Sequence, residues 1–121
     1  MASKLSYVRV YAGPDGESHF EDVEVELTPA MQVSELSETF PVTRMNLRRN
    51  QLEYNLDFHP APRRQFILNL TGMVEMETSD GEVRRFGPAS ILLVEDTTGK
   101  GHKSRSVGNE ERISVFVHLP A

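Results

Sequence analysis

The sequence predicts an all-β domain, on three observations. Its 8 glycines and 7 prolines are spread as breaks between short segments. No stretch of a dozen residues carries the i, i+3, i+4, i+7 apolar spacing of an amphipathic helix. Several segments instead alternate apolar and polar side chains, as half-buried strands do. Strands that recur at short intervals with turns between them are typical of a β-sandwich or a small barrel.

Two strands and a loop are expected in the first third of the chain. Tyr7–Tyr11 alternates in the strand pattern, and the Gly-Pro-Asp-Gly run at 13–16 favours a turn. Phe20–Leu27 places valine and leucine on one face and glutamate on the other, and Pro29 ends this strand. Ser34–Thr39 fits either a short helical turn or a plain loop.

Stronger strand patterns follow. The expected strands are Val42–Leu47, Gln51–His59, Phe66–Leu70, Val74–Thr78, Val83–Phe86, Ser90–Val94 and Arg112–Leu119. The polar residues 48–50 are expected to turn between the first two of these strands. Asp80 and Gly81 predict a tight hairpin, because Asp-Gly readily adopts the positive φ values that such a turn requires. Glu95–Gly101 is expected to be a long polar loop.

Composition and charge limit the class of protein. The 121 residues, 38% of them hydrophobic, suit one domain over residues 1–121. A formal net charge of −5 argues against nucleic-acid and anionic-membrane partners. The longest apolar runs, such as Ile91–Val94, are far shorter than the roughly 18–20 residues that span a bilayer. Because the chain has no cysteine and no apolar leader, we expect a cytoplasmic protein without disulfides, thiolate ligands or a cysteine nucleophile.

The stretch from His59 to Gly72 resembles the first sequence motif of the cupin superfamily. That motif has two histidines separated by one residue, then Glu or Gln, and a glycine after six further residues. The stretch from Gly87 to His102 resembles the second motif. The resemblance covers most of the chain and implies a double-stranded β-helix, a jelly-roll barrel in which both motifs line one site. Residues 1–41 would then be N-terminal strands and a loop, and residues 42–119 the barrel.

The resemblance implies an incomplete metal site. Carried over residue by residue, His59 matches the first motif histidine, Ala61 the second, Gln65 the Glu, and His102 the histidine of the second motif. Two imidazoles and one amide oxygen would then hold a divalent transition metal such as Zn, Fe, Mn or Ni, with one imidazole and one negative charge fewer than the full set. In the other interpretation the same residues only form hydrogen bonds in a pocket. The sequence leaves both open.

Strand parity decides whether His59 reaches an interior. On Gln51–His59 the apolar side chains alternate with a polar set that ends at His59. If the polar set points inward, an apolar outer face results, and it must be covered by the N-terminal strands or a second subunit. We expect this register and a homodimer, with the outer face formed by Leu56, Phe58, Phe66, Leu68 and Leu70. In the opposite register His59 lies on the surface; Pro60 and Pro62 would also allow a bulge here.

An inward Arg63 needs either a carboxylate, for which Asp57 is nearest in sequence, or an anionic ligand. As a solvated strand-edge residue it would need neither. His19 could reach the mouth of the barrel if its strand lies beside the motif strand, although an exposed position near the turn is the simpler interpretation.

Two classes of function follow. The first is binding of a small organic ligand, anionic if Arg63 contacts it, by a set of polar residues: His59, Arg63, Gln65, His102 and His19. The second, implied by the resemblance, is a metal-dependent lyase, isomerase or oxygenase with His59, Gln65 and His102 as ligands. A metal-free enzyme in which His59 or His102 transfers protons lies between the two. The fold alone does not choose among them, because function depends on the site.

Overall fold

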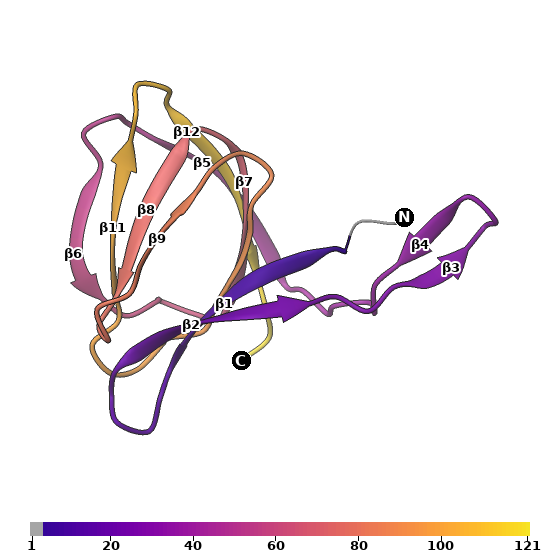
Figure 1. Ribbon diagram of the computed structural model, residues 1–121, viewed down its shortest axis with the longest axis horizontal. Helices are drawn as coiled ribbons and strands as arrows, with labels where there is room; N and C mark the ends of the chain where they lie inside the picture. Colours follow the sequence, from indigo (N-terminus) through magenta and orange to yellow (C-terminus); the bar gives the residue numbers. More distant parts are fainter. Residues whose placement is uncertain (1–3) are drawn as a thin grey trace.

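The computed structural model describes residues 4–121, and within that range the chain is all β-strand, turn and loop, without a helix. Figure 1 shows the strands as a compact body and a projecting hairpin. The strands are β1 (Ser6–Ala12), β2 (Ser18–Glu24), β3 (Thr28–Ala30), β4 (Ser34–Leu36), β5 (Arg44–Asn50), β6 (Asn55–His59), β7 (Gln65–Thr71), β8 (Met73–Thr78), β9 (Val83–Phe86), β10 (Ile91–Val94), β11 (His102–Val107) and β12 (Arg112–His118). The all-β class is confirmed.

Two sheets build the body. The larger has six strands in the order β2-β1-β10-β7-β12-β5, and the smaller has four in the order β6-β11-β8-β9. Neighbouring strands are antiparallel except β1 and β10, which are parallel. The expected closed barrel is not formed, since within residues 4–121 no strand pairing joins the edges of the two sheets. None of these described residues forms a helix long and apolar enough to cross a membrane.

The hydrophobic core lies between the sheets. The apolar run of β10 occupies the middle of the large sheet, where Leu92 and Val94 are almost completely buried. Alternate residues of the neighbouring strands point to the same interior, because side chains alternate across a strand. The buried apolar cluster consists of Val10, Phe20, Ala61, Ile67, Val74, Met76, Phe86, Leu92 and Val94.

Three local expectations need correction. Residues 48–50 continue β5, and the turn to β6 lies at 51–54, where the Tyr54 N–H donates to the Gln51 carbonyl. The strand β11 follows the polar loop and was not expected, since its sequence carries no apolar alternation. In Ser34–Thr39, the residues Ser34–Leu36 form the second strand of a β-hairpin with Thr28–Ala30, and only residues 37–39 are a loop. The Asp80-Gly81 hairpin is confirmed, with Gly81 at φ 97°.

His59 faces the space between the sheets as expected, but the alternation expected over Gln51–His59 is not kept. The register of β6 against β11 shifts between the His59–His102 and Leu56–Ser104 pairs, so Tyr54, from the apolar set, also lines the cavity, and Asn55, from the polar set, does not. Leu56 and Phe58 are 40% and 41% exposed. The expected apolar outer face is nevertheless not continuous, because these two residues and the β7 residues belong to different sheets. Within the β7 group Phe66 is already covered, with edge-to-face contacts to Tyr7 at 5.4 Å and Phe40 at 5.0 Å between ring centroids.

Candidate functional site

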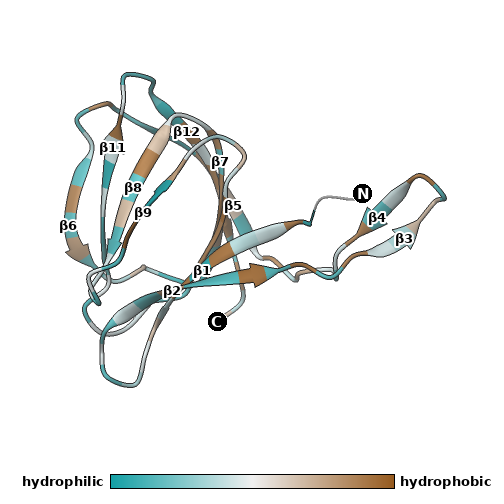
Figure 2. Cartoon of the chain, in the orientation of Figure 1, coloured by the Kyte–Doolittle hydropathy of each residue, from teal (hydrophilic) through white to brown (hydrophobic). Residues whose placement is uncertain are grey.

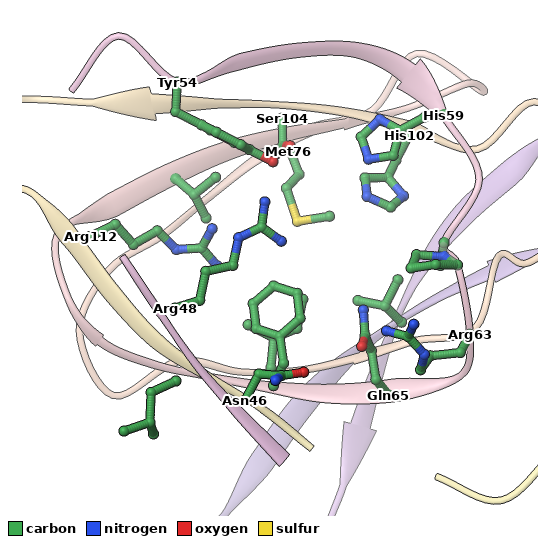
Figure 3. A pocket seen from close by; sticks show the side chains of 17 residues that line it. Asn46, Arg48, Tyr54, His59, Arg63, Gln65, Met76, His102, Ser104 and Arg112 are labelled. Atoms are coloured by element: carbon green, nitrogen blue, oxygen red, sulfur yellow. Dashed lines mark hydrogen bonds between the residues drawn. The ribbon is translucent and has the colours of Figure 1, made fainter. Parts of the chain in front are cut away.

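A cavity of about 360 Å³ opens between the two sheets. Its lining comes from β5, β6, β7, β8, β10, β11 and β12 and from the segments before and after β6. Figure 3 shows polar side chains at two ends of the cavity and apolar ones between them. The polar lining residues are Asn46, Arg48, Tyr54, His59, Arg63, Gln65, His102, Ser104 and Arg112.

His59 and His102 meet at one end of the cavity. The last residue of β6 and the first of β11 are paired in the sheet, and the imidazole centroids are 4.8 Å apart. Gly101 permits this approach: it has φ 75°, and a Cβ there would lie 2.0 Å from the His59 carbonyl oxygen. A glycine before β11 therefore brings the two histidines together.

Each histidine is held through its Nδ1 atom. Nδ1 of His59 lies 2.7 Å from the Asp57 carbonyl oxygen, and a carbonyl only accepts, so this Nδ1 donates. Nδ1 of His102 lies 2.6 Å from Oδ2 of Asp96, and both of these side chains are buried. Neither Nε2 atom has a hydrogen-bond partner among residues 4–121. Both Nε2 atoms therefore remain free to bind a ligand.

The other residues carried over from the motif share this end of the cavity. Ala61 and Arg63, from the loop after β6, and Gln65, the first residue of β7, all line it. Gln65 is only 3% exposed, and its Oε1 accepts no hydrogen bond from the described residues. Arg63 is exposed at the rim. Asp57 is not its partner: no ion pair joins the two among residues 4–121, and the Asp57 carboxylate accepts the N–H of Phe58.

Two further arginines occupy the opposite end, and the sequence interpretation missed both. Arg112 begins β12 and is 4% exposed, and its Nε donates to Oδ1 of Asn69 at 2.8 Å. Arg48, on the adjacent strand β5, donates from Nε to Oδ1 of Asn50 at 3.0 Å and lies 4.9 Å from the ring centroid of Phe116. Figure 3 shows both guanidinium groups directed into the cavity.

Burial of Arg112 is electrostatically unfavourable. Desolvation, together with the nearby charge of Arg48, lowers its pKa from 12.5 to about 10, so the side chain stays charged at neutral pH. The neutral amide oxygen of Asn69 offsets this cost only in part. Gly72 fixes the position: it has φ 73°, and a Cβ there would come within 2.8 Å of the Arg112 Cα.

The three arginines of the cavity differ from most arginines of the chain. Arg48, Arg63 and Arg112 form no salt bridge with any of residues 4–121, and none of the side chains that line the cavity is acidic. Elsewhere each of six arginines is ion-paired: Arg9, Arg49, Arg64, Arg84, Arg85 and Arg105. In a chain with net charge −5, a cavity with three uncompensated guanidinium groups is a locally cationic site.

His19 does not belong to this site. Its ring contacts Asp15 at 3.5 Å and Asp80 at 3.0 Å, where the β1–β2 turn meets the β8–β9 hairpin. Burial alone would lower the His19 pKa, but the hydrogen bonds to the two carboxylates outweigh it and raise the pKa above 6.5. The residue links two hairpins and does not line the cavity.

The site does not fit a resident divalent metal. Among the residues that the structure describes, no group of three or more His, Asp or Glu side chains is placed to hold a metal ion. The donors at hand are the two imidazoles and the Gln65 amide oxygen, and Ala61, which lines the same end, has no donor atom in its side chain. Arg63 adds a positive charge beside them. This donor set is weak for a cation and suitable for an anion or a hydroxyl-bearing ligand.

No protein-family model matches the chain, and no curated protein does.

The missed residues had only faint sequence signals. In 44–50 the polar residues Asn46, Arg48 and Asn50 alternate with Met45 and Leu47, which is a strand pattern across the expected turn. In β12 the apolar residues do share one face, as expected, but the cavity is lined from the opposite face by Arg112 and Phe116. Which face turns inward depends on pairing with β7, far away in sequence.

Proposed function

We propose that the protein binds a small organic anion in the cavity between its two sheets, and that its fold is a cupin-like jelly roll. The observation that carries the binding proposal is Arg112, a charged guanidinium that is 4% exposed and has no acidic partner among residues 4–121. Proteins rarely bury such a group unless it is paired. A carboxylate or phosphate of a ligand would supply the missing negative charge.

The lining indicates how the ligand would lie. Its anionic group binds between Arg48 and Arg112, since guanidinium groups match the planar geometry of carboxylates and phosphates. The body of the ligand contacts Met76 and Phe116. A cavity of about 360 Å³ suits a compound of metabolite size.

The far end of the cavity favours a ligand with a second polar group. His59 and His102 present unbonded Nε2 atoms there, Gln65 presents an unbonded amide oxygen, and Arg63 stands at the rim. A hydroxyl could donate to one of these acceptors, and a second carboxylate could bind Arg63. Hydroxy acids and dicarboxylates carry both kinds of group.

Thermal unfolding with defined probes tests this proposal. Succinate, glutarate, citrate and inorganic phosphate at equal ionic strength are compared with chloride, and succinamide serves as the uncharged isostere of succinate. A ligand at about 100 times its Kd stabilises the folded state by about 2.7 kcal/mol, which raises the melting temperature by several degrees. At least one probe anion should do so, and succinamide should not.

A matched pair of variants locates the effect. Arg48→Gln removes a cavity guanidinium, and Arg105→Gln removes an exposed one that pairs with Glu75 outside the cavity. The first should abolish the anion-dependent rise, and the second should leave it intact. Equal responses of both variants, or no rise with any probe anion, would contradict the proposal.

The buried pair of His102 and Asp96 favours a second candidate function, metal-free proton transfer on the bound anion. A carboxylate that holds Nδ1–H of a histidine leaves Nε2 as a base that faces the ligand. Such an enzyme would exchange the acidic C–H protons of a keto acid with solvent. NMR of 2-oxoglutarate in D₂O should show faster exchange with the protein than with Asp96→Asn. Equal rates would leave binding as the function.

A further inference from the structure

The end of the cavity that holds Arg48 and Arg112, here called the arginine end, brings two positive charges close together. In the pairing of β5 with β12, Arg48 lies opposite Ser114 and Arg112 lies opposite Asn50, so the two arginines are diagonal neighbours on one face of the large sheet. The charge of Arg48 is one of the causes that lower the pKa of Arg112, which agrees with this placement. No acidic side chain lines the cavity, so both charges remain uncompensated.

Most hydrogen-bond donors of these two side chains are still free. A guanidinium donates through Nε and through both Nη atoms. Only the Nε–H group is used, by Asn69 in the case of Arg112 and by Asn50 in the case of Arg48. Within residues 4–121 no oxygen accepts a hydrogen bond from the Nη atoms of either arginine. The Nη groups of both side chains are therefore available to a ligand.

Two hydroxyl groups face the arginine end from the other side of the cavity. Ser104 lies on β11 of the small sheet, a strand that Figure 2 shows to be hydrophilic over most of its length, and Tyr54 lies just before β6. Their hydroxyl oxygens are 3.0 Å apart, so one hydroxyl donates to the other and the second hydrogen is left for a ligand. The guanidinium carbon of Arg48 is 5.7 Å from the centre of the Tyr54 ring, and Figure 3 shows the hydroxyls opposite the two guanidinium groups.

A single carboxylate satisfies this arrangement only in part. It is planar and carries one negative charge, so one guanidinium would stay uncompensated. A phosphate monoester carries a charge of about −1.5 to −2 near pH 7 and three acceptor oxygens. Those oxygens are arranged as a tetrahedron, so two can accept from the arginines of the large sheet while the third accepts from the hydroxyl pair on the opposite side.

We propose that the arginine end selects a phosphate monoester, whose dianionic group binds the two arginines and the hydroxyl pair of Tyr54 and Ser104 together. This inference narrows the class of anion, and it rests on the anion binding proposed above. Carboxylates would still bind at the arginine end, but more weakly. The carbon body of the ester then contacts Met76, which Figure 3 shows between the arginine end and the two histidines.

Calorimetric titration at about pH 8, where the ester is a dianion, tests this selection with three small probes. Ethyl phosphate is the phosphate monoester. Ethyl sulfate has the same tetrahedral shape with one negative charge, and malonate carries two negative charges on two planar groups. Because ethyl phosphate alone offers both the charge and the shape, its Kd should be at least about tenfold below the Kd of either other probe.

The outcomes separate this proposal from the proposed function. A smaller difference between ethyl phosphate and the other two probes would overturn the phosphate selection, and binding of any probe or of succinate would still support the anion site. If neither succinate nor any of the three probes binds, both proposals are wrong.

Variants of the hydroxyl pair complete the test. The double variant Tyr54→Phe, Ser104→Ala removes both partners of one hydrogen bond and no charge, so the protein should melt nearly as the wild type does. The Kd of ethyl phosphate should rise by about tenfold in this variant, and that of succinate by less than about threefold. Tyr11→Phe, at a tyrosine outside the cavity, should change neither Kd. An unchanged Kd of ethyl phosphate in the double variant, or an equal rise for succinate, would overturn the proposal.

Discussion

Replacing Arg112 by methionine should leave the ligand-free protein at least as stable as the wild type while it removes anion binding. The folded-state pKa of Arg112 is about 10, against 12.5 for an exposed arginine. At about 1.4 kcal/mol for each pKa unit, keeping this group charged in the cavity costs about 3 kcal/mol. Methionine resembles the aliphatic part of arginine, carries no charge and is flexible enough to adapt to the space.

The substitution also has a cost. Oδ1 of Asn69 loses its donor, and a buried acceptor without a partner costs about 1–3 kcal/mol. The net change in the free energy of unfolding is therefore a gain of about 0–2 kcal/mol. At about 4 °C for each kcal/mol in a domain of this size, the melting temperature should rise by about 0–8 °C. A typical buried substitution instead destabilises by about 1 kcal/mol.

Urea unfolding and calorimetric titration with succinate measure the two effects separately. Hydrogen bonds to charged groups contribute about 1.5–3 kcal/mol, so the succinate Kd should rise by about 10-fold to 150-fold in the variant. Arg105→Met, at an exposed position outside the cavity, should change neither quantity appreciably. A variant that loses more than about 2 kcal/mol of stability and still binds succinate as tightly as the wild type would refute the reasoning. Arg112 would then be a structural residue.

Three further changes test other parts of the structure. Because the pKa of His19 is raised above 6.5, its ion pairs stabilise the fold fully below pH 6.5, and this stabilisation is lost as the pH rises through the pKa of the folded state. His19→Gln removes this contribution, so between about pH 6 and 8 the melting temperature of the variant should fall less than that of the wild type. Gly101→Ala would put a methyl group 2.0 Å from the His59 carbonyl oxygen at a φ of 75°, so the free energy of unfolding from chemical denaturation should fall by at least about 2 kcal/mol. An unchanged denaturation midpoint would contradict the close approach of Gly101 to His59. Ala61→His adds a third imidazole to the cavity and should create Zn²⁺ binding, seen as a chelator-reversible rise in melting temperature; no gain over the wild type would show that the imidazoles do not converge.

Local sequence patterns predicted one end of the site and missed the other. The alternation over Gln51–His59 predicts that His59 faces inward, as it does, although a register shift in β6 brings Tyr54, from the apolar set, into the same cavity. The positions of Ala61 and Gln65 beside His59 are also predicted from one short stretch of chain. The Asp80-Gly81 hairpin is predictable for a similar reason, since the turn residues adopt the required φ values themselves.

Arg48 and Arg112 could not be found in this way. Their orientation depends on the pairing of β5, β12 and β7, strands that are neighbours in the sheet and distant in the chain. Their polarity also favours the wrong prediction, because the run Arg-Arg-Asn at 48–50 is typical of a turn. It continues the strand β5 here because the cavity accepts polar side chains in its lining. The strand β11 was missed for the same reason, because its buried residues His102 and Ser104 are polar.

The most direct test of anion binding in the cavity is an NMR titration that follows the Nε–Hε signals of the arginine side chains as succinate is added. We expect saturable shifts for Arg48 and Arg112, accompanied by shifts of the His102 imidazole, and none of these with succinamide. Signals of Arg85 and Arg105, which lie in exposed ion pairs with Glu75, should stay in place. Shifts limited to these exposed arginines, or cavity signals that move equally with succinamide, would contradict the account.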